Sequence, residues 1–310
     1  MANLMSSAVT MSLAEKTKIA LDESRMLMLG AQILLGFQFH APFQDGFSRL
    51  SPPEKATEII VLHTIVIVIA LLITPSARHR IVERGEDAPA FNRFVTQIAM
   101  ITLAPLALAL SLDLYVAGNL SLGSPIGAVM GLIGGLAAIG LWYGPCVLRN
   151  SEGGPAVSTS NEKTSHAAKI NYVLTEARVV LPGVQALLGF QLVIVLTTSF
   201  ADLSAGAKAI HGMALGFVAL AIMLLIAPAA YHRIVYEGAD VPEFYRIAGR
   251  FLLLATIFLA LGLSADIQVV TAKITGSEVF ANITAIATAM VLLGLWHIWP
   301  YWLRIRARKP

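Results

Sequence analysis

The chain has 310 residues, of which 56% are apolar and only 13% are Asp, Glu, Lys or Arg, about half the charged share of roughly 25% that is usual in globular proteins. Long runs without a charge, such as 59–73 and 251–263, exclude an ordinary soluble domain and predict membrane-spanning helices. The net charge is +3, but the basic residues flank the apolar runs, so we assign them to membrane topology and not to nucleic-acid binding.

In chain order, the apolar runs predict eight spans. They cover residues 26–43, 57–75, 94–117, 125–148, 179–199, 208–230, 247–271 and 279–302. The shortest would be about 27 Å long at 1.5 Å per residue, which matches the apolar core of a bilayer. We therefore expect an all-α integral membrane protein. Residues 1–20 lack an apolar core followed by a cleavage site, so we expect a cytoplasmic N-terminal segment and no cleaved signal peptide.

The basic residues predict the orientation of the spans. Eighteen Lys and Arg residues fall on the side of the two termini, and four fall on the other side, at Arg49, Lys55, Lys208 and Lys273. Positive residues are enriched in cytoplasmic loops. Both termini are therefore expected in the cytoplasm.

A constant offset of 153 residues divides the chain into two repeats. It relates Glu23 to Glu176, Gln32 to Gln185, and Asp113 to Asp266, among other pairs. We predict a first four-helix repeat at 21–148, a linker rich in Ser, Gly, Asn and Thr at 149–170, and a second repeat at 171–310. Because each repeat has an even number of spans, the two should run parallel, related by a pseudo-twofold axis along the membrane normal.

A polar hinge occurs in both repeats, at 79–93 and 232–246. The copies share H-R-I-V and then Gly, Asp, Pro, Phe and Arg at the same positions. Gly85 is suited to end a helix, while Asp87 and Asp240 are suited to cap the next one, which begins near a proline. These residues predict a helix–turn–helix elbow. The remaining His79, Arg80, His232 and Arg233 either complement helix dipoles and anionic lipids or form a titratable cluster.

The first helix of each repeat carries further polar side chains. They are Glu23, Arg25 and Gln32 in the first repeat, and Glu176, Arg178 and Gln185 in the second. Glu and Arg two residues apart cannot pair on one helix, so each needs a partner elsewhere. Two interpretations remain open: these side chains hold the bundle together, or they line a pathway between the repeats with the hinge at its cytoplasmic mouth.

Secondary candidates lie farther from the hinge. Glu58 and His211 occupy equivalent positions, as do Asp113 and Asp266, while His63 has no counterpart. Trp296, Trp299 and Trp302 are typical of an aromatic belt at the membrane surface. No phosphate-binding loop, paired metal-binding histidines or nucleophile elbow is present in the sequence. We therefore expect no enzyme, no bound cofactor and no metal.

The segments 175–192 and 227–246 resemble a bacterial family of four-helix membrane proteins of unknown function, some of which are labelled sodium:proton antiporters. The resemblance covers residues 170–271 and, more loosely, 17–118. It implies a protein of the bacterial cytoplasmic membrane in which a duplication has fused two copies that would otherwise pair. The first repeat departs from the family pattern at Leu29, Glu58 and Arg78. The pattern falls on Glu176, Arg178, Pro182, Gln185, Phe190, Gln191, His211, His232, Arg233, Asp240 and Asp266.

Three functional hypotheses follow from the sequence. The first is a transporter or channel for a small cation or proton, with its pathway between the repeats. The second is a non-catalytic membrane module that binds a lipid, a partner or a signal through its cytoplasmic hinges. The third is a redox protein whose histidines ligate haem. Beyond the lipid bilayer, the sequence leaves the partners and the oligomeric state of this fused pseudo-dimer open.

Overall fold

The computed structural model of the protein is helical throughout the part of the chain that it describes. That part comprises residues 13–86, 88–148, 165–237, 239 and 241–307. Eight of its helices are long and apolar enough to cross a membrane. All eight coincide with predicted spans, so the all-α, multi-pass prediction agrees with the structure.

The helices extend past the apolar runs that predicted them. The first half contains α1 (Leu13–His40), η1 (Ala41–Phe43), η2 (Asp45–Arg49), α2 (Pro52–Arg78), η3 (His79–Glu83), α3 (Pro89–Leu122) and α4 (Ser124–Leu148). The second half contains α5 (His166–Val195), α6 (Thr198–Ala201), α7 (Ala205–Ile234), α8 (Pro242–Thr275), α9 (Glu278–Leu293), η4 (Gly294–Ile298) and α10 (Trp299–Arg306). Polar side chains occupy these extensions, which is why hydropathy alone underestimated helix length.

Serine and threonine residues start several of the helices. Ser51 and Glu54 form a reciprocal capping box at the start of α2. The side chains of Ser165 and Ser204 accept hydrogen bonds from backbone N–H groups in the first turns of α5 and α7. These bonds satisfy amide groups that a helix start leaves unpaired.

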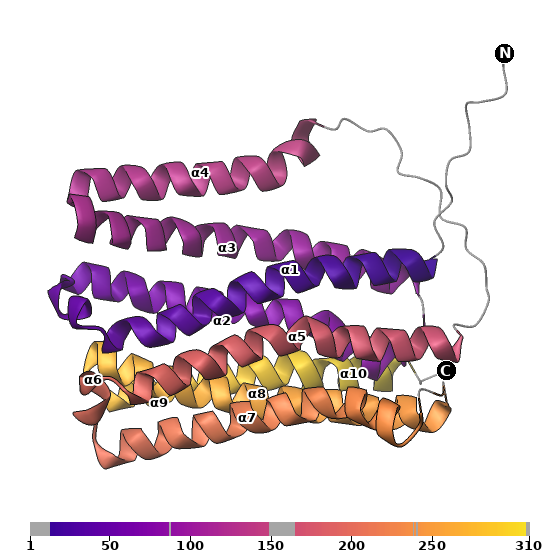
Figure 1. Ribbon diagram of the computed structural model, residues 1–310. Helices are drawn as coiled ribbons and strands as arrows, with labels where there is room; N and C mark the ends of the chain where they lie inside the picture. Colours follow the sequence, from indigo (N-terminus) through magenta and orange to yellow (C-terminus); the bar gives the residue numbers. More distant parts are fainter. Residues whose placement is uncertain (1–12, 87, 149–164, 238, 240, 308–310) are drawn as a thin grey trace.

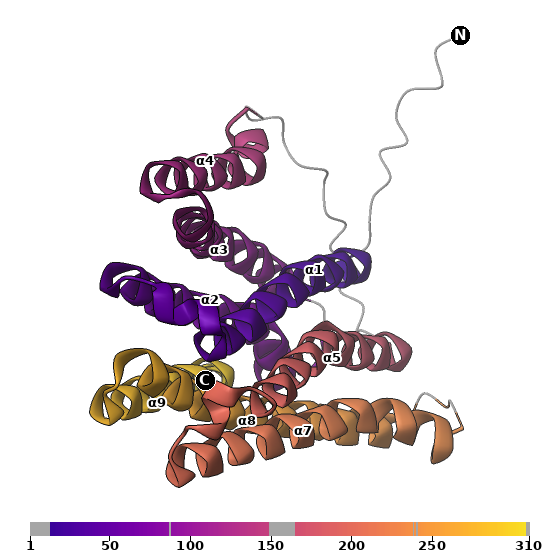
Figure 2. The same cartoon turned by 60° about the vertical axis from the view of Figure 1, so that its left-hand side comes forward.

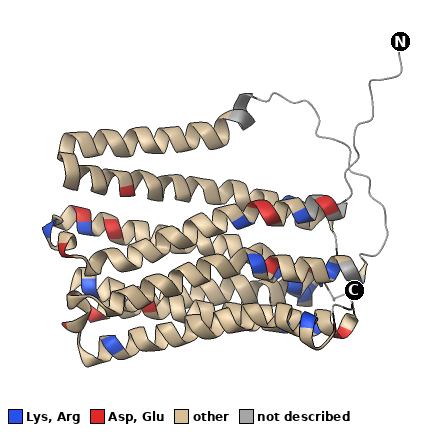
Figure 3. Ribbon diagram, viewed as in Figure 1, with Lys and Arg blue, Asp and Glu red and all other residues tan. Residues whose placement is uncertain are grey.

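The two halves lie side by side and begin at the same end of the bundle (Figure 1). We call this the hinge end, because it also carries the H-R-I-V segments. Helices α1 and α5 pack against one another, and the turned view in Figure 2 shows α9 beside α2 while α4 lies outermost, next to α3. Charged residues gather at the two ends of the bundle and leave long uncharged middles (Figure 3), as a bilayer-spanning bundle requires.

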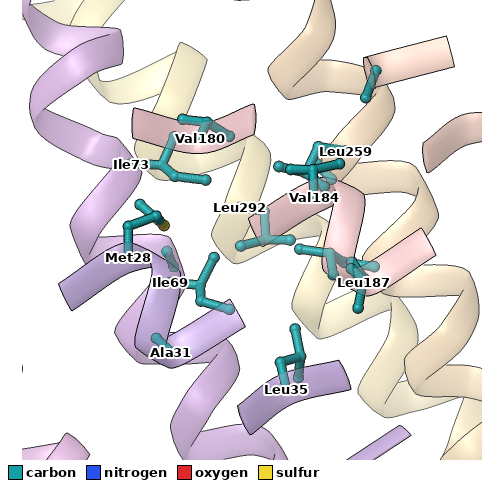
Figure 4. Close-up of a cluster of buried hydrophobic side chains, with 14 of the residues drawn as sticks. Met28, Ala31, Leu35, Ile69, Ile73, Val180, Val184, Leu187, Leu259 and Leu292 are labelled. Carbon is teal, nitrogen blue, oxygen red and sulfur yellow. The ribbon is translucent and has the colours of Figure 1, made fainter. Parts of the chain in front are cut away.

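An apolar core joins the halves. Met28, Ala31 and Leu35 on α1 and Ile69 and Ile73 on α2 are fully buried. They belong to the same core as side chains of α5, α8 and α9, which are Val180, Val184, Leu187, Leu259 and Leu292 (Figure 4). A pathway along this contact would have to displace these side chains.

The helices that follow the two elbows begin close to the predicted positions. Helices α3 and α8 begin after Ala88 and Val241, and neither residue makes a capping hydrogen bond through its side chain. The predicted caps, Asp87 and Asp240, each lie one residue earlier and fall outside the described residues. At the first elbow the left-handed residues are Arg84 and Gly85. The turn therefore starts one residue before the predicted glycine.

Trp296 corrects the prediction of a purely superficial aromatic belt. Its side chain is fully buried, and its indole Nε1 donates a hydrogen bond of 2.9 Å to the backbone oxygen of Ala70. Trp302 is exposed beneath Arg306, as a belt residue would be. Trp296 thus connects the last helix of the second half to α2 of the first half.

Candidate functional site

A buried ion cluster connects the halves at the hinge end. Glu176 on α5 accepts a hydrogen bond from Nδ1 of His79 at 2.6 Å and a second bond from Nε of Arg80. The side chains of His79 and Glu176 are fully buried, and that of Arg80 nearly so. Such a cluster binds the halves together, because removing one partner would leave an uncompensated buried charge.

Aromatic side chains enclose this cluster. The His79 ring stacks on Phe91 at 4.5 Å and meets the edge of Tyr172 at 5.6 Å, while the Arg80 guanidinium lies 5.1 Å from the Tyr245 ring. The π-helical turn η3 directs His79 and Arg80 towards α5. With Nδ1 bonded to Glu176, the other ring nitrogen of His79, Nε2, is buried and has no hydrogen-bond partner among the described residues.

The structure separates the other hinge-end candidates from this cluster. Glu23, Arg25, Arg178, Gln185 and Arg233 are exposed, and His232 is half-buried beside Phe244. Gln32 is buried against Gly183, and its Oε1 has no hydrogen-bond partner within the described part of the chain. The two glutamates, Glu23 and Glu176, therefore do not face each other across a cavity.

A second cluster lies at the opposite end of the second half. His211 and Asp266 form an ion pair, with 3.2 Å between Nδ1 and Oδ1. Gln191 donates a hydrogen bond to Asp266, and Nε2 of His211 lies 3.1 Å from the backbone oxygen of Gln191. All three side chains are buried. In this cluster the carboxylate of Asp266 is compensated from within the protein.

The equivalent positions of the first half form an open site. Gln38 donates a hydrogen bond of 2.7 Å to Asp113, in the same way that Gln191 donates to Asp266. The position of His211, however, is taken by Glu58. Glu58 is only 7% exposed and has no hydrogen-bond or ion-pair partner among the described residues. Two carboxyl groups therefore replace a neutralised pair.

A cavity of about 410 Å³ adjoins these two carboxyl groups. It lies between α1, η1, η2, α2 and α3. Glu58 and Asp113 contribute its acidic groups, while its walls are mainly apolar and include Phe37, Phe47, Leu110, Leu114 and Leu120. An apolar cavity with a few convergent polar groups is the usual form of a small-molecule site. We call this the Glu58–Asp113 pocket.

His63 lies outside both clusters. Its Nδ1 contacts the backbone oxygen of Ile59 at 2.8 Å, and its Nε2 is buried without a partner among the described residues. In that same part of the chain, no group of three or more His, Cys, Asp and Glu side chains could hold a metal ion.

Sequence reasoning missed the role of Gln38 and Gln191. Both close the shared L-L-G-F-Q run, and each lies 75 residues before the aspartate that it contacts. That spacing, repeated in both halves, was a signal that could have paired them. It could not have revealed the cavity, whose walls come from five separate elements.

The described part of the chain has eight long apolar helices, and a Gln–Asp pair recurs at equivalent positions in the two halves. These features define a class, that of an internally duplicated membrane protein with eight candidate spans. The chain belongs to a protein family of unknown function, DUF6328, whose pattern matches residues 14–145 and again 159–300. The double match agrees with a tandem duplication. No curated protein and no solved structure matches the chain.

Proposed function

We propose that the protein is a proton-linked transporter of organic cations and that it binds them in the Glu58–Asp113 pocket. The observation that carries this proposal is the difference between the halves. The second half pairs Asp266 with His211, while the first half places a second carboxyl group at the same position. This replaces the earlier hypothesis of a pathway between the repeats, where apolar packing fills the contact.

The walls of the pocket favour a cation with an apolar body. A Na⁺ or K⁺ ion that sheds its water needs several oxygen ligands in its place, whereas Phe37, Phe47 and the leucines offer only apolar or aromatic surface. A quaternary ammonium or protonated amine suits such walls, because its hydrocarbon groups bury apolar area and its charge is attracted to aromatic faces. Glu58 and Asp113 would supply the opposite charge.

Two neighbouring carboxyl groups also provide the link to protons. Charged groups within a membrane are costly unless they are neutralised. In the empty pocket, protons would neutralise Glu58 and Asp113, and an entering cation would displace at least one of them. Cation binding and proton release are then two sides of one equilibrium, which is the requirement for exchange.

The proposed setting is the bacterial cytoplasmic membrane with both termini in the cytoplasm. The 18 basic residues on the side of the termini support this orientation. The pocket lies at the end of the bundle opposite the hinge, so it would open in the outer half of the bilayer.

Equilibrium binding of tetraphenylphosphonium to the purified protein tests the site. We expect saturable binding that weakens as the pH falls, because protons compete with the cation for the carboxylates. Glu58→Gln and Asp113→Asn should each reduce affinity at least tenfold. Asp202→Asn is the matched control, since it removes an exposed carboxylate at the same end of the bundle. Equal affinity in all four proteins would exclude the pocket.

A binding module without transport is the second candidate function. It is favoured by the ion cluster of Glu176, His79 and Arg80, which binds the halves together and gives no sign of a moving part. Proteoliposomes distinguish the two functions. A protein that binds tetraphenylphosphonium in detergent, but adds nothing to its uptake into vesicles with a pH gradient, would be a binding module.

A further inference from the structure

The contact between α1 and α5 is one-sided. A Cβ at Gly36 would overlap the ring of Phe190, and a Cβ at Gly183 would overlap the side chain of Gln32. A twofold axis would repeat both contacts with the roles of the helices exchanged, bringing Gly189 to Phe37 and Gln185 to Gly30. Those four residues are instead exposed, and an added Cβ at Gly30 or Gly189 would meet nothing within 4 Å.

The ion cluster at the hinge end is one-sided as well. Glu176 of the second half lies between His79 and Arg80 of the first half. Its counterpart, Glu23, is exposed. The counterparts of His79 and Arg80 line a cavity of about 240 Å³ between α5 and α7, whose polar lining residues are Arg178, His232 and Arg233. One half thus has a filled basic pocket, and the other has an open one.

The faces of α2 and α7 repeat this difference. Ala70, Ile73 and Ala77 on α2 are buried in the core that joins the two halves. Their counterparts on α7, which are Met223, Ile226 and Ala230, are all exposed. By contrast, Ile60 and its counterpart Met213 are exposed in both halves, at 53% and 54%. The exposed surface of α7 therefore includes a stripe that its counterpart on α2 uses for contact.

Gln185 indicates that contact with lipid is unfavourable for the exposed surface of α5 and α7. It lies near the middle of the span 168–195, is exposed, and makes no hydrogen bond to another described residue. An amide at that depth is unfavourable against hydrocarbon and is usually satisfied by a neighbouring helix. Its counterpart Gln32 is buried between α1 and α5 and is thereby kept from lipid, although its Oε1 has no hydrogen-bond partner among the described residues.

We propose that a second copy of this chain docks its first repeat on the second repeat of the first copy, reproducing the internal contact. Glu23 of the incoming copy then enters the pocket of Arg178, His232 and Arg233. Phe37 of that copy covers Gly189, and Gln185 packs beside its Gly30. The charges, shapes and positions of these residues match those of the residues in the internal contact between the two repeats.

The membrane permits this association. Both repeats begin at the same end of the bundle (Figure 1), so two copies in one bilayer present the required faces in parallel. The contact is heterologous, because the two surfaces differ. Such contacts continue from copy to copy and end only where a ring closes.

Disulfide cross-linking in native membranes tests the proposal. Gly30→Cys and Gln185→Cys are introduced together on a Cys146→Ser background and oxidised. Head-to-tail docking predicts covalent dimers and larger ladders, and either substitution alone should give no ladder. A cross-link confined within single chains would instead indicate a twofold contact and would overturn the proposal, as would the absence of any cross-link.

A charge swap tests the same contact by particle mass in lipid nanodiscs. Glu23→Arg and Arg233→Glu should each reduce the assembly to single chains, and the two together in one chain should restore it. Met223→Trp should also disrupt it, whereas the matched Met213→Trp should not. If Arg233→Glu removes only bound anionic lipid and leaves the mass unchanged, the pocket is a headgroup site and the second copy is excluded. These readouts do not depend on the cation site.

Discussion

The acidic site of the first half and the equivalent cluster of the second half differ in the type of one residue. His211 and Glu58 occupy equivalent positions, and each half has a Gln–Asp pair beside them. Histidine compensates the aspartate, whereas glutamate adds a second acidic group.

Glu58→His tests this comparison directly. The variant should reproduce the His–Asp pair in the first half, because Asp113 and Gln38 already lie in the positions of Asp266 and Gln191. We expect tetraphenylphosphonium binding to disappear while the melting temperature stays the same or rises. A protein that still binds the cation with unchanged affinity would show that Glu58 does not contact it.

Glu176→Gln addresses the other cluster. The substitution leaves Arg80 buried without its carboxylate, and loss of one partner of a buried ion pair costs about 3–5 kcal/mol. We expect a large fall in the free energy of unfolding in mixed micelles. Glu23→Gln, at the exposed counterpart, is the control and should have a small effect in single chains. Equal effects of the two substitutions would contradict the asymmetry of the halves.

At the scale of elements, the sequence predicted the helices better than their partners. Hydropathy located all eight spans because lipid demands long apolar helices. The offset of 153 residues identified the repeat. Neither could predict that α1 and α5 would use different faces, because the residues concerned, such as Gly30 and Gly183, are identical in the two halves. These equivalent residues on α1 and α5 differ only in the neighbouring helices that surround them.

The candidate site was predicted only in part. Glu58, Asp113, His211 and Asp266 were identified as secondary candidates from their repeat positions. Hydropathy placed them near a membrane surface, where a solvated carboxylate is unremarkable. The cavity beside Glu58 and Asp113 depends on η1 and η2, the short helices that return the chain from α1 to α2. Apolar periodicity does not report such turns.

The first elbow provides a prediction at the scale of elements. Gly85 is left-handed, with a φ of 76°, and an added Cβ would overlap the hydroxyl of Tyr245. Gly85→Ala should therefore cost about 1–2 kcal/mol of backbone strain and also displace Tyr245 from its 2.6 Å hydrogen bond to the oxygen of Arg84.

Gly276→Ala is the matched control for that substitution. Gly276 is also left-handed, with a φ of 68°, but an added Cβ there would meet nothing within 4 Å. Thermal unfolding should show the larger loss for Gly85→Ala. Equal losses would mean that Tyr245 does not support the elbow.

For the whole molecule, the central expectation is its orientation. Single cysteines at Glu237 and Asp202, on a Cys146→Ser background, lie at opposite ends of the bundle. In right-side-out vesicles, an impermeant maleimide should label the cysteine at 202 and not the one at 237. The reverse pattern would place the Glu58–Asp113 pocket on the cytoplasmic side and contradict the proposed orientation.

Proton movement driven by an organic cation tests the proposed function most directly. Proteoliposomes with a trapped pH dye are given tetraphenylphosphonium on one side, without an initial pH gradient and with the membrane potential clamped. Exchange predicts that protons leave the vesicles as the cation enters, in the wild type and in Asp202→Asn but not in Glu58→Gln. An interior pH that follows empty liposomes in all three proteins would contradict proton-linked transport.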